Sequence, residues 1–176
     1  MQKSQDEAWK AIREIQKYIK SNKTIDEEWQ SIRDDQNNIS ETNNTFDSFA
    51  ERLYSSALPK KLKKLGLLFN RTTTYRSAEG IYAEIHAMLE SGTQGMVMAI
   101  EQTLCIADID EHLVRMEKIR KHANEHGDKR QFMGAIAATI TDEGTRNYAL
   151  NQGLFVIEPS GEDVKVTKPA TEPRIW

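Results

Sequence analysis

Apolar and polar positions follow two different periods along the chain, and the change falls near Thr45. Before Thr45, apolar residues recur at alternating steps of three and four, which is the spacing of one face of an α-helix. The first proline is Pro59 and the first glycine is Gly66, so neither residue interrupts this helical stretch. After Thr45, short apolar runs separated by glycines indicate strands that alternate with helices. The pattern predicts a helical arm at 1–45, a compact domain at 46–166 and a tail at 167–176.

The helical arm has the heptad spacing of a coiled coil. Its core positions are Ala8, Ala11, Ile15, Tyr18, Asn22, Ile25, Trp29, Ile32, Gln36, Ile39, Asn43 and Phe46. Polar residues at three of the a positions weaken the seam but would define its register. We therefore expect a homo-oligomer formed through the arm. The number of chains stays open, because isoleucine at d and asparagine at a favour different numbers of strands.

A second interpretation of the arm is a helical hairpin. Thr24-Ile25-Asp26-Glu27 fits a capping box, in which the threonine side chain and the glutamate side chain each accept a backbone amide at the start of a helix. A turn at Ser21-Asn22-Lys23 would then separate two shorter helices. Both interpretations make the helix depend on packing, since a helix this polar is marginal by itself.

The domain predicts a mixed α/β fold. A helix is expected at 46–57 and should bend or end at Pro59, because proline has no amide hydrogen. The runs 80–89 and 96–100 predict a β-hairpin. Further along we expect a helix stopped at Gly127, a buried strand at 132–140, a helix from 141 to Gly153, a core strand at 154–157 and an edge strand at 164–166. The proline-containing tail is expected to be flexible, with Trp176 as the residue that would dock.

Composition narrows the functional classes. The chain has 176 residues and a net charge of −3, so binding to nucleic acid would need a local basic surface. A single cysteine, Cys105, excludes an internal disulfide and suits a reducing compartment. No stretch approaches the roughly 18 uncharged residues of a membrane span, and the N-terminus has no apolar signal region. We therefore expect a soluble, cytoplasmic protein without a membrane partner.

Basic residues gather after the first predicted helix of the domain. The candidate nucleic-acid contacts are Lys60, Lys61, Lys63, Lys64, Arg71 and Arg76. Such a group could contact phosphates, although a solvated lysine face is the commoner explanation. No aromatic residue interleaves with the lysines, so the sequence shows no stacking platform for bases. DNA is therefore one candidate partner.

Several stretches of the domain carry a resemblance to a known family. They read FDSFAERL, AEIHAMLESG, DIDEHLVRMEKIRKHANEHGDKR, GAIAATI and YALNQGLFVIEPSGEDVKV. In this order the chain resembles a group of prokaryotic proteins with a coiled-coil arm and a PD-(D/E)XK, restriction-endonuclease-like domain. The resemblance implies an αβββαβ core on a mixed sheet.

The same resemblance implies a degenerate catalytic motif. In the family, an Asp and a Glu on adjacent strands hold Mg²⁺, and a Lys two residues after the Glu helps to activate water. Here the Asp position falls on His86, and the Glu-x-Lys positions fall on Ala99 and Glu101. A supporting helix glutamate corresponds to Glu51. We therefore expect a protein without enzymatic activity or cofactor, which acts in binding or assembly.

An altered active site is the alternative. Strand alternation places Ala99 and Glu101 on one face, and His86 lies on the neighbouring strand. His86, Glu101 and Glu51 would then be the catalytic and metal-binding residues of a metal-dependent DNA endonuclease. An imidazole with two carboxylates suits Mn²⁺ or Zn²⁺ better than Mg²⁺. A third interpretation, a pure coiled-coil scaffold, would make the residues after Thr45 dispensable for partner binding.

Overall fold

The computed structural model describes residues 44–74 and 85–176, together with the isolated positions 13, 30, 31, 34, 38 and 41. The chain divides into two units, Met1–Asn44 and Thr45–Trp176. The predicted coiled-coil seam, the alternative hairpin and Arg76 therefore lie almost entirely outside the described residues. The described fold is that of the second unit.

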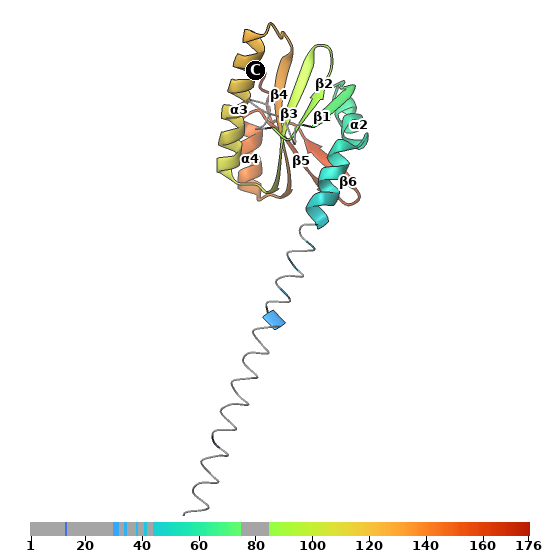
Figure 1. The fold of residues 1–176 in the computed structure, drawn as a ribbon, viewed down its shortest axis with the longest axis vertical. Helices are drawn as coiled ribbons and strands as arrows, with labels where there is room; N and C mark the ends of the chain where they lie inside the picture. The colour runs from blue at the N-terminus through green and yellow to red at the C-terminus, as the bar shows by residue number, and fades with distance from the viewer. Residues whose placement is uncertain are drawn as a thin grey trace, which may run out of the picture. The chain divides into compact units, whose positions relative to one another are not determined.

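Among the described residues, six strands form one mixed sheet with helices on both faces (Figure 1). In chain order the elements are helical residues 44–54, α2 (Ala57–Lys64), β1 (Arg71–Thr74), β2 (Ala87–Glu90), β3 (Gln94–Thr103), α3 (Ile106–Glu125), β4 (Gln131–Ile140), α4 (Glu143–Asn151), β5 (Phe155–Ser160) and β6 (Asp163–Thr167). The strands lie in sequence order. The β3–β4 and β4–β5 pairs are parallel, and the others are antiparallel. Parallel neighbours need a crossover connection, which α3 and α4 supply. The mixed α/β class predicted from the sequence is confirmed.

Alternation along β3 divides the hydrophobic interior into two cores. The α2-side core contains Met96, Met98 and Ile100 of β3, together with side chains of the helical residues 44–54 and of α2. The α3-side core contains Val97 of β3, with side chains of α3 and α4. Because both faces of the central strands are covered, β4 is buried without a break from Phe132 to Ala138. The exposed polar residues of the sheet therefore lie mainly on the edge strands β1 and β6 and near the ends of the central strands.

Pro59 does not end the first helix of the domain, contrary to the expectation from the sequence. The helical residues 44–54 end before a bend at Ser55, and α2 begins at Ala57. Pro59 lies in the first turn of α2, where an amide hydrogen would have no intrahelical partner. The proline therefore fits the start of the second helix.

The strand boundaries at the beginning of the sheet also differ from the predicted pattern. β1 covers the polar run Arg71–Thr74, which the apolar pattern did not identify. Of the predicted strand 80–89, residues 80–84 lie outside the described residues, and β2 begins at Ala87. β1 pairs with β2 along its whole length, from Arg71 opposite Glu90 to Thr74 opposite Ala87. Three β-branched threonines suit this short outer strand.

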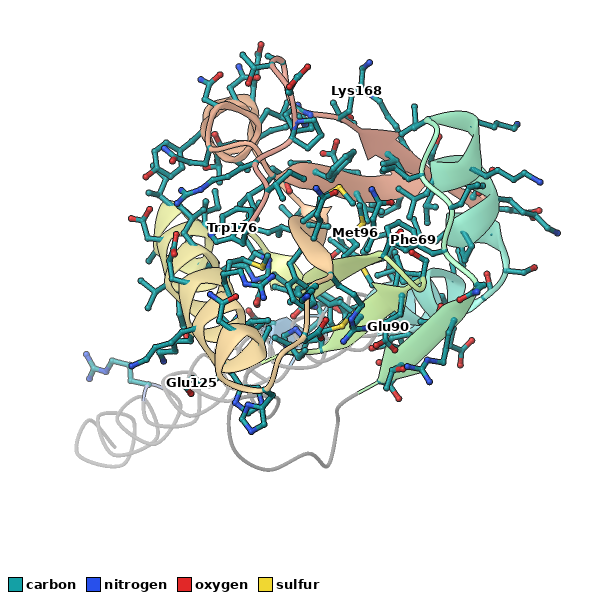
Figure 2. All side chains as sticks on the ribbon, turned by 90° about the horizontal axis from the view of Figure 1, so that it is seen from above. Phe69, Glu90, Met96, Glu125, Lys168 and Trp176 are labelled. Carbon is teal, nitrogen blue, oxygen red and sulfur yellow. The ribbon has the colours of Figure 1, made fainter. Side chains whose placement is uncertain are left out.

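Thr167, the first residue of the predicted tail, belongs to β6, and residues 168–176 have no regular secondary structure, yet the last of them are hydrogen-bonded to the domain. The backbone nitrogen of Trp176 donates to the Phe132 carbonyl at 2.9 Å, and the Phe132 nitrogen donates to the Trp176 carbonyl at 3.1 Å. The indole nitrogen of Trp176 donates to Glu117 on α3 at 2.9 Å. Trp176 (Figure 2) is only 8% exposed and belongs to the α3-side core. The docking of Trp176 therefore adds the tail to the packed domain.

Candidate functional site

His86 stands immediately before β2 and caps a backbone group of β3. The hairpin register pairs Ala87 with Met98, which brings His86 alongside Ala99. The backbone nitrogen of Ile100 donates a hydrogen bond of 2.8 Å to Nδ1 of His86. The backbone nitrogen of His86 donates to the Met98 carbonyl at 3.3 Å. The imidazole thus accepts a hydrogen bond from the Ile100 amide, one residue before β2 begins at Ala87.

This hydrogen bond determines the protonation of His86. A backbone amide can only donate, so Nδ1 must be unprotonated and the neutral ring carries its hydrogen on Nε2. Although His86 is exposed as a residue, partial burial of its ring, followed by the charge of Arg115, holds the pKa of His86 below its ordinary value. A metal-bound histidine normally coordinates through one nitrogen and donates from the other. In its present position His86 cannot do both, because Nδ1 is already an acceptor.

Glu101 lies two residues beyond Ala99 and faces α3. The Glu101 side chain is half-buried, whereas Ala99 is only 2% exposed. Burial raises the pKa of Glu101, Asp108 and Glu111 raise it further, and Arg115 acts in the opposite direction. The acid group is therefore easier to protonate than an ordinary glutamate. The position opposite His86 itself carries only the methyl group of Ala99.

A buried cation from α3 lies close to both residues. Arg115 is 8% exposed, and its two terminal nitrogens contact Nδ1 of His112 at 3.3 Å and Glu111 at 3.2 Å. Its charge lowers the pKa of both His86 and Glu101. A permanent positive charge near these two side chains repels a divalent cation. Sequence reasoning missed Arg115, because nothing in the local pattern shows that it turns inward.

His112 is completely buried beneath Arg115. Its burial, together with the charge of Arg115, lowers the pKa of His112 to about 3. Gly134 of β4 lies beside the ring, since a Cβ built there would be 3.5 Å from Nε2 of His112. Nε of Arg115 has no hydrogen-bond partner in the part of the chain that the structure describes, whereas a hydrogen bond with the backbone of Val97 acts on His112 and raises its pKa against the larger effect of burial. The low pKa therefore keeps His112 neutral beside the guanidinium group of Arg115.

The structure does not bring Glu51 together with His86 and Glu101. Glu51 is exposed on the helical residues 44–54, whose buried side chains Phe49 and Leu53 join the α2-side core. Glu101 instead interacts electrostatically with α3, on the opposite face of the sheet. Within residues 44–74 and 85–176, no three His, Cys, Asp or Glu side chains are grouped so that they could hold a metal ion. The sheet thus separates Glu51 from the other two predicted ligands, His86 and Glu101.

The lysines of the predicted nucleic-acid surface lie on α2, from which side chains project outward (Figure 2). Lys60 and Lys63 border a groove of about 340 Å³ between α2 and the segment that enters β1. The other residues of this α2–β1 groove are Ser56, Pro59, Leu68, Phe69, Asn70, Arg71 and Thr72. Lys61 turns toward β6 and forms an ion pair of 2.6 Å with Asp163. The structure therefore divides the predicted basic group between two sides of α2.

The fold also places an aromatic residue beside these lysines. Phe69 packs partly against the α2-side core and lines the same groove as Lys60 and Lys63. The sequence showed no aromatic side chain interleaved with the lysines, because Phe69 follows the end of α2. The turn at Gly66, with a φ of 84°, returns the chain alongside the helix. This glycine is the local signal that could have indicated the contact.

Comparisons with known proteins assign the chain to no family: no family model, no curated protein and no solved structure matches it. No helix within the described ranges is long and apolar enough to cross a membrane. The function is therefore inferred from the geometry of the residues above and from the resemblance of the sequence motifs.

Proposed function

We propose that this chain is a binding or assembly protein built on a nuclease-like αβββαβ domain that lacks a phosphodiester-cleaving centre. Its N-terminal arm joins copies of the chain into a homo-oligomer. The observation that carries the loss of catalysis is the hydrogen bond from the Ile100 amide to Nδ1 of His86, at 2.8 Å. His86 stands where the related nucleases have a metal-binding aspartate. Its side chain is engaged instead by a backbone amide.

The surroundings of His86 support the same proposal. Metal-assisted cleavage needs ligands that hold a divalent cation and a site at which water is activated. Ala99 offers no ligand opposite His86, and Glu101 takes the position of the lysine that would assist the water. Arg115 supplies a positive charge to this region without any metal. A protein domain of this kind can still present a surface to a partner.

A metal titration with a built-in positive control tests this proposal. Mg²⁺, Mn²⁺ and Zn²⁺ are titrated calorimetrically into the full chain, and in parallel into the triple variant His86→Asp, Ala99→Glu, Glu101→Lys. The triple variant restores the side chains of the related nucleases at the matching positions. We expect no binding to the original protein and measurable Mg²⁺ or Mn²⁺ binding to the variant, with circular dichroism confirming that both are folded.

The contrary outcome is equally clear. Metal binding by the original protein that is lost in the double variant His86→Ala, Glu101→Ala would favour a rearranged endonuclease site. Manganese-dependent nicking of supercoiled DNA that is lost in the same variant would have the same meaning. Either result would overturn the proposal of a non-catalytic domain.

The assembly part of the proposal has a separate test. Sedimentation of the full chain should show an oligomer at micromolar concentrations, since a seam of this length gains its stability from packing. The substitution Ile32→Asp at a core position of the heptad should shift the protein toward monomer. The exposed position Asp34 provides a matched control, and Asp34→Asn should leave the oligomer unchanged. A monomeric full chain at high micromolar concentration would contradict this part.

A further inference from the structure

Two lysines on α2 lack the counter-charges that their neighbours have. Lys61 pairs with Asp163 at 2.6 Å, and Arg71 pairs with Glu90 at 2.9 Å. Within the described part of the chain, Lys60 and Lys63 form no ion pair, although both border the α2–β1 groove. Residues three apart on a helix lie on the same face, so the two ammonium groups repel one another. An anionic ligand would relieve this repulsion.

The other wall of the groove exposes two apolar side chains among polar ones. Leu68 is 62% exposed, and Phe69 presents the part of its ring that the core does not cover. Asn70 and Thr72 add an amide and a hydroxyl group to the same wall. A groove of about 340 Å³ is in the size range of pockets for small organic molecules. The groove therefore combines Lys60 and Lys63, and Arg71 paired with Glu90, with a surface suited to one flat, polar-edged ring.

We propose that the α2–β1 groove binds single-stranded nucleic acid, with phosphates on Lys60 and Lys63 and a base against Leu68 and Phe69. The inference rests on the proposed function, because it names a partner for a domain that binds without cutting. Single-strand binding modules combine a basic track with aromatic surfaces on which bases stack. A duplex keeps its bases stacked inside and would offer this groove only phosphates. An acidic peptide would pair with the lysines but supplies a ring only where an aromatic residue flanks its acidic groups, whereas every nucleotide carries one.

Binding to a labelled oligothymidine of about 12 nucleotides tests the phosphate contacts. Fluorescence anisotropy with the full chain is measured across a series of salt concentrations. The variant Lys60→Gln, Lys63→Gln is compared with Lys121→Gln, Lys129→Gln, which removes the same charge from exposed positions at α3 and the loop after it. Each lost phosphate contact lowers the slope of log affinity against log salt by about 0.7 for a single strand. We therefore expect the magnitude of this slope to be smaller by about 1.4 in the first variant and unchanged in the control.

Substitutions of Leu68 and Phe69 test the base contact. Leu68→Ser changes an exposed side chain, and Phe69→Leu retains an apolar group but removes the aromatic ring. Loss of base stacking should weaken binding to the oligonucleotide by about fivefold or more. Binding of inorganic polyphosphate, which has charge but no bases, should be unchanged in both variants. Thermal unfolding of each variant checks that the domain is intact.

Three outcomes would overturn the inference. Unchanged binding by the Lys60→Gln, Lys63→Gln variant would remove the phosphate contacts from this groove. Equal affinity for oligonucleotide, duplex and polyphosphate would remove the base contact. Preference for vesicles of acidic lipid over the oligonucleotide would assign the lysines to a membrane surface.

The two proposals fail in different ways. Absence of oligonucleotide binding, together with absence of metal binding, would overturn the groove and leave the non-catalytic domain in place. Cleavage of the bound oligonucleotide with Mn²⁺ would overturn the non-catalytic domain and leave the groove in place.

Discussion

Glu90 at the end of β2 and Arg130 just before β4 are joined by an ion pair of 2.7 Å, although they lie 40 residues apart in the sequence. Glu90 is only 5% exposed. It also accepts hydrogen bonds from Thr73 at 2.7 Å and from Arg71 at 3.0 Å. This carboxylate therefore ties the outer strands of the sheet to the turn that follows α3.

Replacing Glu90 by glutamine should lower the free energy of unfolding by about 2 kcal/mol, because a buried charged acceptor is lost. Burial raises the pKa of Glu90, but hydrogen bonds from Arg130 and Thr73 and the charge of Arg71 outweigh it, so the pKa lies below its ordinary value. The contribution is therefore present above about pH 4.5 and is lost as the pH falls below that value. Urea unfolding at several pH values measures it.

The matched control for Glu90 is Arg71→Gln. The Arg71 side chain is 69% exposed, so its ion pair with Glu90 is screened by water. Its loss should change the unfolding free energy by less than about 1 kcal/mol. Equal effects of the two substitutions would contradict the central position of Glu90.

His86→Ala should destabilise the protein by about 1 kcal/mol, because it removes the acceptor of the Ile100 amide. His86→Asn should retain most of the stability, since its side-chain oxygen can take the place of Nδ1. The pKa of His86 is lowered by burial and by Arg115, so its neutral form favours the folded state. This contribution diminishes as the pH falls below about 6.5, and the asparagine variant should lack that dependence in urea unfolding. A fully stable alanine variant would show that the hydrogen bond is dispensable.

His112 should make folding sensitive to mild acid. Its pKa is about 3 in the folded protein, because the ring is buried beside Arg115. The unfolded chain binds a proton near pH 6.5, so the unfolding free energy should decrease as the pH falls from about 6.5 to about 3. His112→Asn keeps an acceptor for Arg115 and does not titrate. Its unfolding free energy should depend less on pH over this range, and an unchanged dependence would exclude His112 as the cause.

Trp176→Ala should lower the unfolding free energy by about 3 kcal/mol, because a large buried ring leaves the α3-side core. The variant also lacks the 2.9 Å hydrogen bond that the Trp176 indole donates to Glu117. The neighbouring residue Ile175 is 48% exposed and serves as the control. Ile175→Ala should change stability by less than about 0.5 kcal/mol. Thermal or urea unfolding of the two variants distinguishes a docked tail from a loosely attached one.

The ends of α3 and α4 and the start of α4 could be predicted because they depend on neighbouring residues. Asp142 was expected near the start of a helix, and its carboxylate accepts the Thr145 amide at 3.0 Å as an N-terminal cap. Gly127 and Gly153 were expected to stop helices, and their φ angles are 71° and 82°. Glycine adopts this left-handed conformation without the cost that a Cβ adds. The buried run of β4 was predictable for a similar reason, since its apolar residues are contiguous.

The candidate site was only partly predictable. Strand alternation placed Ala99 and Glu101 on one face, and the hairpin register brings His86 alongside Ala99. The burial of Arg115 and the position of Phe69 beside α2 depend on how the helices and loops pack against the sheet. Neither is visible in a local pattern.

By itself, therefore, the sequence determined the α/β class, the ends of α3 and α4 and the central strands, because hydrophobic period and capping act over a few residues. Only the tertiary structure decided that the sheet separates Glu51 from His86 and Glu101, and that Trp176 completes the α3-side core. Those relationships join residues far apart in the chain. They depend on strand order and on the packing of two faces, which local preferences do not encode.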